Sequence, residues 1–431
     1  GTAAEVTAAL VTTASLVVVS DATVTVSDAD ATALNATALS AIGAKTTGTV
    51  TVTNAVAISG TAAEVTAALV TTASLVVVSD ATVTVTGTAT VAQINAIAAK
   101  TTGVVTATAS VGDMATLTGL TTAATDAITV TVTDTTVASD ELVAMDLLTS
   151  NQITATAMTT ITGTFAEIYA VTVTADAATT LNTDEDYNAT VSDTSIASAN
   201  LTLLDTDTSG TVTATAADTI TGTASAIQTA ITSTGITTST DYNVTITGAA
   251  SVAQLTTIDD DTSGVITAAA ITDTFGNIQT LVGNSPSVIE NATGTITANG
   301  SFIGETITMA NIADLANVTI NGLQGDDTIV GANGGDTING GTGNDQIVGG
   351  QGNDTVTGGS GTDTFVVADI ETNGSDNIHT FTSSNDAANV AQGDDKIVFS
   401  TEDLTAVTGY AAYTGSGTTI TLTDGSLVEY V

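Results

Sequence analysis

Five aspartates spaced nine residues apart are the side chains in this sequence whose type and spacing best suit a chemical task. Each is the sixth residue of a nine-residue block, and the blocks read GLQGDDTIV, GANGGDTIN, GGTGNDQIV, GGQGNDTVT and GGSGTDTFV. The aspartates are Asp327, Asp336, Asp345, Asp354 and Asp363, and the eighth residues are the apolar Ile329, Ile338, Ile347, Val356 and Phe365. Carboxylates at a fixed spacing suit the binding of hard cations, which prefer oxygen ligands.

The other residues of each block predict how the aspartates are positioned. Glycine at the first and fourth positions of most blocks predicts tight turns with positive φ, and the apolar tail predicts a short strand. If two blocks make one coil, Asp327, Asp345 and Asp363 share one edge, while Asp336 and Asp354 share the other. Carboxylates one coil apart repel each other unless a hard cation lies between them, with turn carbonyls completing an oxygen shell. A flexible Gly/Asp/Asn-rich linker is the alternative, and five consecutive matches disfavour it.

The blocks resemble the Ca²⁺-binding nonapeptide repeat of RTX proteins. The resemblance implies a parallel β-roll with three complete Ca²⁺ sites. These sites would lie between Asp327 and Asp345, between Asp345 and Asp363, and between Asp336 and Asp354. It implies nothing about a catalytic activity.

Charge limits the classes of partner. The chain has 431 residues, with 45 acidic against 3 basic side chains and a formal net charge of −42. Nucleic-acid binding is excluded, because three lysines cannot neutralise a phosphate backbone. So much negative charge opposes close association unless cations screen or bridge it, which favours a saline, calcium-rich medium.

The cysteine count and the apolar runs limit the compartment. The sequence has no cysteine, so disulfides and thiolate metal sites are excluded, and bound metal is a sufficient substitute for disulfides outside the cell. We expect no cleavable signal peptide and no transmembrane helix or membrane insertion, since no run reaches the required length. The start at Gly1 falls inside a repeat, which indicates a processed protein or a fragment of a larger array.

The N-terminal two-thirds is itself repetitive. Residues 1–26 recur unchanged as residues 60–85, and weaker copies continue to about residue 282. One kind of segment places Thr and Glu three residues apart before an apolar helical pattern, at Thr2, Thr61 and Thr164. This spacing is that of a capping box and predicts short helices with defined starts.

A second kind of segment has apolar residues three apart, as in Val91, Ile94 and Ile97, or Leu142 and Met145. These segments end in a Thr-x-Gly stop, at Gly48, Gly103, Gly210 and Gly264, with Asn151 in place of glycine in one copy. Glycine and asparagine readily take the left-handed conformation of a helix C-cap, so we predict that the helices end there by this mechanism.

Strands that alternate Val or Ile with Thr or Ala follow each segment. They are predicted at residues 49–53, 83–86, 104–109, 128–133, 153–157, 189–192, 211–216, 244–247 and 266–270. This alternation buries one face and leaves a threonine face outward. The predicted fold class is therefore a β-rich solenoid, with a strand-plus-short-helix array at the N-terminus and the RTX β-roll at the C-terminus. A string of small β-sandwich domains and low-complexity disorder are the alternatives; short units argue against the first, and 42% apolar content against the second.

Four segments follow from these patterns. They are an array at residues 1–282, a junction with lead-in strands at 283–320, the calcium-binding roll at 321–366, and closing strands with a secretion-signal-like tail at 367–431. Pro286, the only proline, marks the junction. The terminal Leu-Val-Glu-Tyr-Val is similar to the uncleaved signals of RTX proteins exported by type I secretion, and the array resembles parts of bacterial S-layer and cyanobacterial extracellular proteins.

Other candidate cation sites are weaker. The segments that begin at Asp205 and Asp259 resemble the start of an EF-hand loop, but Ala216 and Ala270 replace its bidentate glutamate. Equivalent positions elsewhere hold Lys45 and Lys100, so an acidic helix end is favoured for these segments. The Asp184-Glu-Asp186 triplet fits a solvated loop or a loose calcium contact. Asn-x-Thr/Ser triplets, such as those at Asn188 and Asn243, are expected by chance in a chain so rich in threonine.

We expect no enzymatic activity. His379 is the only histidine, so neither an HExxH zinc site nor a Ser-His-Asp triad outside the closing strands can form, and no G-x-S-x-G motif exists. A glycosidase with paired carboxylates stays open by residue count alone, but the absence of tryptophan leaves little to stack on sugar rings.

The sequence therefore predicts a secreted, calcium-dependent structural protein of a bacterial cell surface, which associates with copies of itself in an S-layer, sheath or filament. An RTX adhesin is the alternative, with the array as a spacer and threonine faces that contact polysaccharide or ice. A fragment of a secreted RTX enzyme is a third possibility, which would need catalytic residues that are absent here.

Overall fold

The fold is β-rich with parallel sheets, and its N-terminal part is α/β. The structure is a computed structural model that describes residues 1–12, 17–71, 76–175, 178, 180–183, 186–309, 318–332, 335–350, 354–361, 363–367, 380–381 and 396–399. Along this described part of the chain, no helix has both the length and the apolar character needed to cross a bilayer. The expectation of a β-rich fold is confirmed.

The chain divides into two compact units, and each is described by itself. The first unit contains Gly1–Asp193, Asn200–Ala216 and Thr234–Thr237. Its helices are α1 (Ala3–Leu10), α2 (Ala36–Gly43), α3 (Ala62–Val65), π-helix η1 (Thr66–Val70), α4 (Val91–Ala98), α5 (Met114–Leu117), α6 (Ser139–Asp146), α7 (Phe165–Tyr169) and π-helix η2 (Ala170–Ala175). Its strands are β1 (Val24–Val26), β2 (Ala33–Asn35), β3 (Val50–Val52), β4 (Ala57–Thr61), β5 (Val76–Val77), β6 (Thr82–Ala89), β7 (Val105–Ala109), β8 (Ala127–Thr131), β9 (Thr136–Ala138), β10 (Ile153–Thr154), β11 (Thr160–Gly163), β12 (Leu181–Asn182), β13 (Asn188–Val191), β15 (Val212–Ala214) and β17 (Ile236–Thr238).

The second unit contains Thr194–Ala199, Ala217–Ser233 and Thr238–Val431, and α8 (Ser198–Asp207) contributes residues to both units. Its other helices are α9 (Ala224–Ile231), α10 (Val252–Asp261), α11 (Phe275–Asn284) and α12 (Pro286–Glu290). Its strands are β14 (Ser195–Ala197), β16 (Thr219–Gly222), β18 (Asn243–Ala250), β19 (Ile266–Thr274), β20 (Ile296–Asn299), β21 (Thr306–Thr308), β22 (Val318–Asn321), β23 (Thr328–Val330), β24 (Thr337–Thr342), β25 (Gln346–Val348), β26 (Thr355–Ser360), β27 (Thr364–Val367), β28 (Thr380–Phe381) and β29 (Lys396–Phe399).

Parallel strands from successive repeats form the sheets of the first unit. A seven-stranded sheet has the order β12-β10-β8-β7-β6-β4-β2, a five-stranded sheet the order β17-β15-β13-β11-β9, and a three-stranded sheet the order β1-β3-β5. Paired residues lie one repeat apart in the chain, as when Val83 pairs with Val105. Strand β7 shows the predicted alternation, because Val105, Ala107 and Ala109 are buried while the threonines between them are exposed. Each sheet thus buries one face of every repeat.

In the second unit, one nine-stranded sheet runs from the array into the nonapeptide block, which we define as residues 322–366. Its order is β14-β16-β18-β19-β20-β22-β24-β26-β28, and a five-stranded sheet has the order β21-β23-β25-β27-β29. Alternate nonapeptides therefore belong to different sheets. The predicted closing strands also form, since β28 pairs in parallel with β26, and β29 with β27. The rest of the C-terminal tail, including the secretion-signal-like end, lies outside the described residues.

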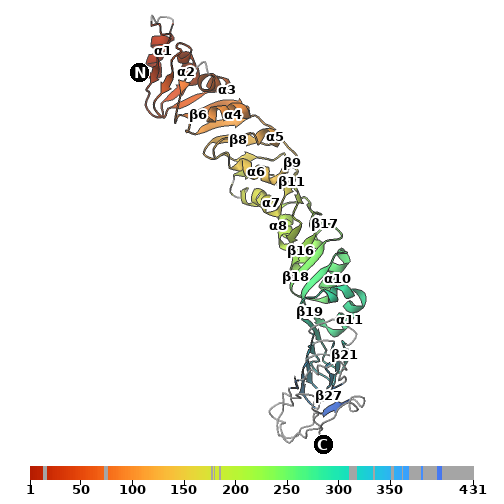
Figure 1. The fold of residues 1–431 in the computed structure, drawn as a ribbon. Coiled ribbons are helices and arrows are strands. Elements are labelled where there is room, and N and C mark those ends of the chain that lie inside the picture. The colour runs from red at the N-terminus through yellow and green to blue at the C-terminus, as the bar shows by residue number, and fades with distance from the viewer. Residues whose placement is uncertain are drawn as a thin grey trace, which may run out of the picture. The chain divides into compact units, whose positions relative to one another are not determined.

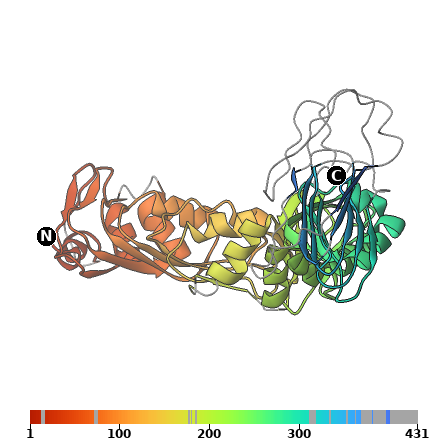
Figure 2. The ribbon, with the colours of Figure 1, turned by 90° about the horizontal axis from the view of Figure 1, so that it is seen from below.

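Short capped helices cover the array strands. The predicted capping boxes of Thr2, Thr61 and Thr164 are confirmed, and in each the hydroxyl accepts from the amide of the glutamate three residues on. Consecutive helices contact each other, as α2 contacts α3 and α3 contacts α4. Figures 1 and 2 show these helices side by side next to the strands of their own repeats.

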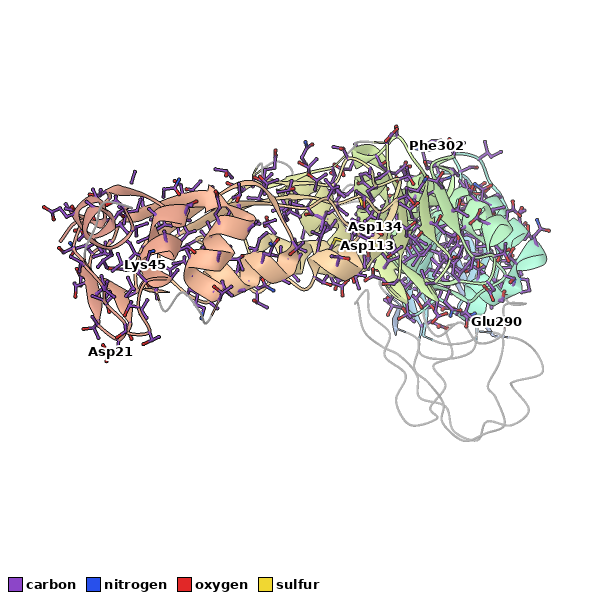
Figure 3. The ribbon with its side chains drawn as sticks, turned by 90° about the horizontal axis from the view of Figure 1, so that it is seen from above. Asp21, Lys45, Asp113, Asp134, Glu290 and Phe302 are labelled. Atoms are coloured by element: carbon purple, nitrogen blue, oxygen red, sulfur yellow. The ribbon has the colours of Figure 1, made fainter. Side chains whose placement is uncertain are left out.

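Several helices are also held at their first amide by an aspartate from the following repeat. Asp28 Oδ2 accepts from Ala3 N–H of α1, Asp134 Oδ2 from Met114 N–H of α5, and Asp273 Oδ2 from Val252 N–H of α10, at 2.6 to 2.9 Å. In Figure 3, Asp134 lies beside Asp113, the N-cap residue of α5. Each such bond satisfies an amide that has no partner within the helix, and it ties two repeats together.

The structure corrects two details of the array. Ile58, Ile161 and Ile220, which lie just before helical segments, belong to the strands β4, β11 and β16, so many repeats carry a second strand that the sequence analysis did not predict. The stop glycines are not in the left-handed conformation, because none has a positive φ. A Cβ at Gly103 or Gly264 would instead collide with a backbone carbonyl of the preceding repeat. Close approach of two chains is therefore the reason for glycine at this position.

A long-range duplication accompanies the short repeats. Strands β6 and β18 have the same length and burial pattern, and each carries a register shift beside a positive-φ glycine, Gly87 or Gly248. Each is followed by a helix whose capping box pairs a hydroxyl with glutamine, at Thr90 with Gln93 or at Ser251 with Gln254. The two units therefore contain equivalent bulged strands that lead into equivalent helices.

Candidate metal centre

The five predicted aspartates directly precede strands of the nonapeptide block. Pairing of β23 with β25 aligns Thr328 with Gln346, and pairing of β25 with β27 aligns Gln346 with Thr364. Asp327, Asp345 and Asp363 therefore form one column. Pairing of β24 with β26 aligns Thr337 with Thr355, so Asp336 and Asp354 form the second column. The spacing of the residues predicts both columns.

Hydrogen bonds between neighbouring repeats hold each column. The amide of Asp327 donates to Asp345 Oδ1 at 2.8 Å, and the amide of Asp345 donates to Asp363 Oδ1 at 3.0 Å. In the other column, the amide of Asp336 donates to Asp354 Oδ1 at 2.9 Å. One oxygen of each acceptor carboxylate thus reaches back to the repeat 18 residues earlier.

The carboxylates of both columns are buried. All five aspartates are at most 2% exposed. Asp327 Oδ2 and Asp345 Oδ2 are buried and accept no hydrogen bond. Burial raises the pKa of Asp336 and of Asp345 to about 6, and it also raises the pKa of Asp327. Ionised groups in such positions are costly unless a cation compensates them.

Oxygen atoms converge beside the first glycine of the blocks. A Cβ on Gly322 would lie closer than 3.0 Å to both Asp327 Oδ2 and the carbonyl oxygen of Gly340. Gly340 has the same relation to Asp345 Oδ2 and the carbonyl of Gly358, and Gly331 to Asp336 Oδ2 and the carbonyl of Gly349. Carboxylate and carbonyl oxygens are the donors that Ca²⁺ prefers. The residues present therefore fit this cation, with one carboxylate oxygen and one carbonyl at each such point.

Backbone carbonyls are available to complete the ligand set. Among the residues that the structure describes, no group of three or more His, Cys, Asp or Glu side chains gathers at one point. The acidic columns supply two carboxylates for each pair of repeats, which is fewer than the six to eight oxygens that Ca²⁺ takes. The turn carbonyls beside the glycines are further protein donors at these points.

The glycine positions that need positive φ differ from the prediction. Gly325, Gly343 and Gly361 at the fourth position have positive φ as predicted. At the second position, Gly341, Gly350 and Gly359 also have positive φ, and Leu323 takes φ 78° there in the first block. The first position has no positive φ among its described members, so glycine is required there by the converging oxygens.

The weaker acidic candidates have hydrogen-bonding roles instead. Asp207 and Asp261, in the segments that resemble EF-hand loops, accept the hydroxyls of Tyr187 and Tyr242. Burial and these carboxylates raise the pKa of both tyrosines. Asp186 is exposed, whereas residues 184–185 and His379 lie outside the described residues.

Two residues that the sequence analysis assigned to chance also have a role. Asn188 Oδ1 accepts from the amide of Thr211, and Asn243 Oδ1 accepts from the amide of Val265, both at 2.9 Å. Each asparagine opens a strand and ties it to the following repeat. Their position directly after a buried tyrosine is the signal that the sequence offered.

Comparison with known proteins identifies the nonapeptide block. The family model described as the RTX calcium-binding nonapeptide repeat (4 copies) matches residues 313–338 and 330–365. No curated protein and no solved structure matches the chain. These repeats bind Ca²⁺, and RTX repeat proteins are typically secreted. Residues 313–365, which contain the aspartate columns, therefore form a region of RTX calcium-binding nonapeptide repeats.

Proposed function

We propose that this chain is a secreted, calcium-dependent structural protein of a bacterial cell surface, and that copies of it associate into an S-layer, sheath or extracellular filament. The observation that carries the proposal is the pair of buried aspartate columns in an RTX repeat, joined to a long array of parallel strands. No enzymatic activity is proposed for it.

Calcium would act as the switch for folding of the nonapeptide block. In the cytosol Ca²⁺ is scarce, so repulsion between the column carboxylates keeps the block unfolded and competent for export. Outside the cell, Ca²⁺ at the roughly millimolar level typical of extracellular sites binds the columns, and binding energy becomes folding energy. The buried, unpartnered oxygens of Asp327 and Asp345 support this step.

Each unit would be a β-solenoid that offers long, regular faces. Successive repeats pair in parallel with in-register threonines, which supports this inference. With 45 acidic residues against 3 basic ones, two such faces repel each other until cations bridge or screen them. The same cation would therefore fold the block and permit association.

An adhesin is the second candidate, and the threonine rows are the observation that favours it. Exposed Thr84 pairs with exposed Thr106, and exposed Thr108 pairs with exposed Thr129, on one sheet. A flat row of hydroxyls at strand spacing suits contact with polysaccharide or ice.

Electron microscopy of the purified chain with and without Ca²⁺ tests the assembly. Ordered sheets or filaments are expected after Ca²⁺ is added, and EDTA should dissolve them. Asp345→Asn, which removes a carboxylate shared by two sites, should raise the Ca²⁺ concentration needed for assembly. Asp21→Asn is the matched control, because Asp21 is exposed and lies far from the nonapeptide block in sequence (Figure 3).

The two candidates predict different outcomes. A chain that folds with Ca²⁺ but stays monomeric at all concentrations rules out self-assembly. Binding of that monomer to a polysaccharide or to ice would then support the adhesin.

A further inference from the structure

The segment before the nonapeptide block contains a degenerate block of its own. Residues 300–308 read GSFIGETIT, which match the nonapeptides at Gly300 in position one, Thr306 in position seven and Ile307 in position eight. Glu305 takes the sixth position in place of aspartate. The segment lies outside the residues matched by the RTX family model, which begin at 313.

Strand pairing places Glu305 at the head of the first aspartate column. Strand β21 pairs in parallel with β23, and Thr306 aligns with Thr328. Glu305 is therefore opposite Asp327, as Asp327 is opposite Asp345. The amide of Glu305 donates to Asp327 Oδ1 at 2.9 Å, which repeats the bond between neighbouring aspartates of the column.

The carboxylate of Glu305 has the surroundings of a column aspartate. It accepts from the amide of Ser301 at position two, just as Asp336 Oδ2 accepts from the amide of Ala332 at position two. A Cβ on Gly300 would lie closer than 3.0 Å to Glu305 Oε1 and to the carbonyl oxygen of Gly322. The convergence of a carboxylate oxygen and a glycine carbonyl seen at Gly322 and Gly340 is thus repeated one turn earlier.

Asp327 supplies independent evidence that a cation belongs at this end of the column. It is 1% exposed, its Oδ1 accepts from Glu305, and its Oδ2 accepts no hydrogen bond. Two carboxylates in neighbouring turns, one of them buried, repel each other unless a positive charge lies between them.

The second column has no such extension. Val318 takes the position opposite Asp336, because its amide donates to Asp336 Oδ1 at 3.0 Å and Thr319 aligns with Thr337. Val318 is buried and apolar. Only the column of Asp327, Asp345 and Asp363 begins with a further carboxylate.

We propose that Glu305 and Asp327, with carbonyl oxygens of the Gly300 and Gly322 turns, form an additional Ca²⁺ site at the start of the nonapeptide block. The chain then holds one more Ca²⁺ than the five aspartates supply. This site stands on calcium binding by the block and is independent of whether copies assemble.

Calcium counting by equilibrium dialysis tests the site, since it reports Ca²⁺ per chain whether or not chains associate. The variants are Glu305→Gln, which keeps the shape and removes the charge, and Glu305→Asp, which restores the residue type of the column. Glu290→Gln is the matched control, because Glu290 is exposed at the end of α12 (Figure 3). Circular dichroism checks that the variants fold in saturating Ca²⁺.

Glu305→Gln should bind one Ca²⁺ fewer per chain than the unmodified protein, whereas Glu305→Asp and Glu290→Gln should keep the full number. An unchanged number and affinity in Glu305→Gln would overturn the proposal. An equal loss in Glu305→Gln and Glu290→Gln would also overturn it, because the effect would then follow net charge and not position.

Discussion

One buried threonine in many repeats of the array joins two repeats. Thr262 Oγ1 donates to the carbonyl of Tyr242 at 2.5 Å and accepts from the amide of Gly264 at 3.0 Å. Equivalent pairs of bonds are made by Thr46, Thr101, Thr149 and Thr208. The hydroxyl therefore connects the end of one helix to the strand of the preceding repeat.

Replacing Thr262 with valine should destabilise the protein. Valine keeps the shape, but it leaves the Tyr242 carbonyl without this donor and the Gly264 amide without this acceptor. A loss of about 1 to 3 kcal/mol in the free energy of unfolding is expected, since buried polar groups lose their partners. Urea unfolding in constant Ca²⁺ measures it.

Thr245→Val is the matched control for this variant, because Thr245 is an exposed residue of β18, the strand that follows Tyr242. Its unfolding midpoint should shift little. Equal effects of the two substitutions would show that the buried hydroxyl has no special role.

The residue just before this threonine varies together with the residue whose carbonyl the threonine contacts. In two repeats the carbonyl partner is Tyr187 or Tyr242, whose hydroxyl donates to Asp207 or Asp261 at the helix end. In two others the carbonyl partner is Ala22 or Ala81, and lysine takes the position of the aspartate. The aspartate is thus present where a tyrosine hydroxyl needs an acceptor.

At the scale of elements, patterns that depend on neighbouring residues in the chain were predictable. The capping boxes at Thr2, Thr61 and Thr164 and the alternating strands, such as β7, follow from local spacing. The aspartate columns were also predictable, because a nine-residue period fixes which residues share an edge.

Features set by contacts between repeats could not be predicted in the same way. The reason for glycine at Gly103 is a carbonyl of another repeat, which leaves no trace in local sequence. Glu305 was missed because its block has Ile303 where a glycine is expected and a spacing to Asp327 of 22 residues. Identical sequences even fold differently, since residues 3–10 form one α-helix while their copy forms α3 followed by π-helix η1.

The stability of the metal-free nonapeptide block and the affinity of the block for calcium should depend on pH in opposite directions. In the metal-free folded block, burial raises the pKa of Asp336 and Asp345 from 3.8 to about 6. The folded block then binds more protons than the unfolded chain between these values, so its stability falls as pH rises through this window. Calcium binding requires the ionised carboxylates, so the Ca²⁺ concentration at half-saturation should rise by up to about tenfold per pH unit below pH 6 for each proton displaced.

Calcium titrations followed by circular dichroism at several pH values between 7.5 and 5, at constant ionic strength, measure this dependence. Asp336→Asn should weaken it by removing one of the titrating groups. A half-saturation concentration that is independent of pH would contradict the assignment of these carboxylates to the metal.

At the scale of the whole molecule, the array should outlast the nonapeptide block when calcium is removed. The array core is apolar, with Leu255 and Ile258 fully buried, whereas the block encloses buried carboxylates that repel one another. Limited proteolysis in EDTA should therefore cut within residues 322–366 and leave a fragment that contains the array. In saturating Ca²⁺ the same sites should be protected.

The digestions in EDTA and in saturating Ca²⁺ serve as controls for each other, and mass spectrometry locates the cuts. Digestion of array and block at the same rate in EDTA would show that the array also depends on calcium. Because β24 of the block belongs to one sheet with β19, β20 and β22 of the preceding segment, β24 should be protected longest.

Pairing of successive described repeats within each unit has a mechanical consequence. Tension on the chain ends would detach repeats one after another, and each detached repeat would lengthen the chain by a fixed amount. A nonapeptide pair releases 18 residues, or about 60 Å of extended chain, and an array repeat such as that from Ser195 to Thr219 releases about 80 Å. The protein would then lengthen in small, discrete steps. Bound calcium would determine which repeats detach last.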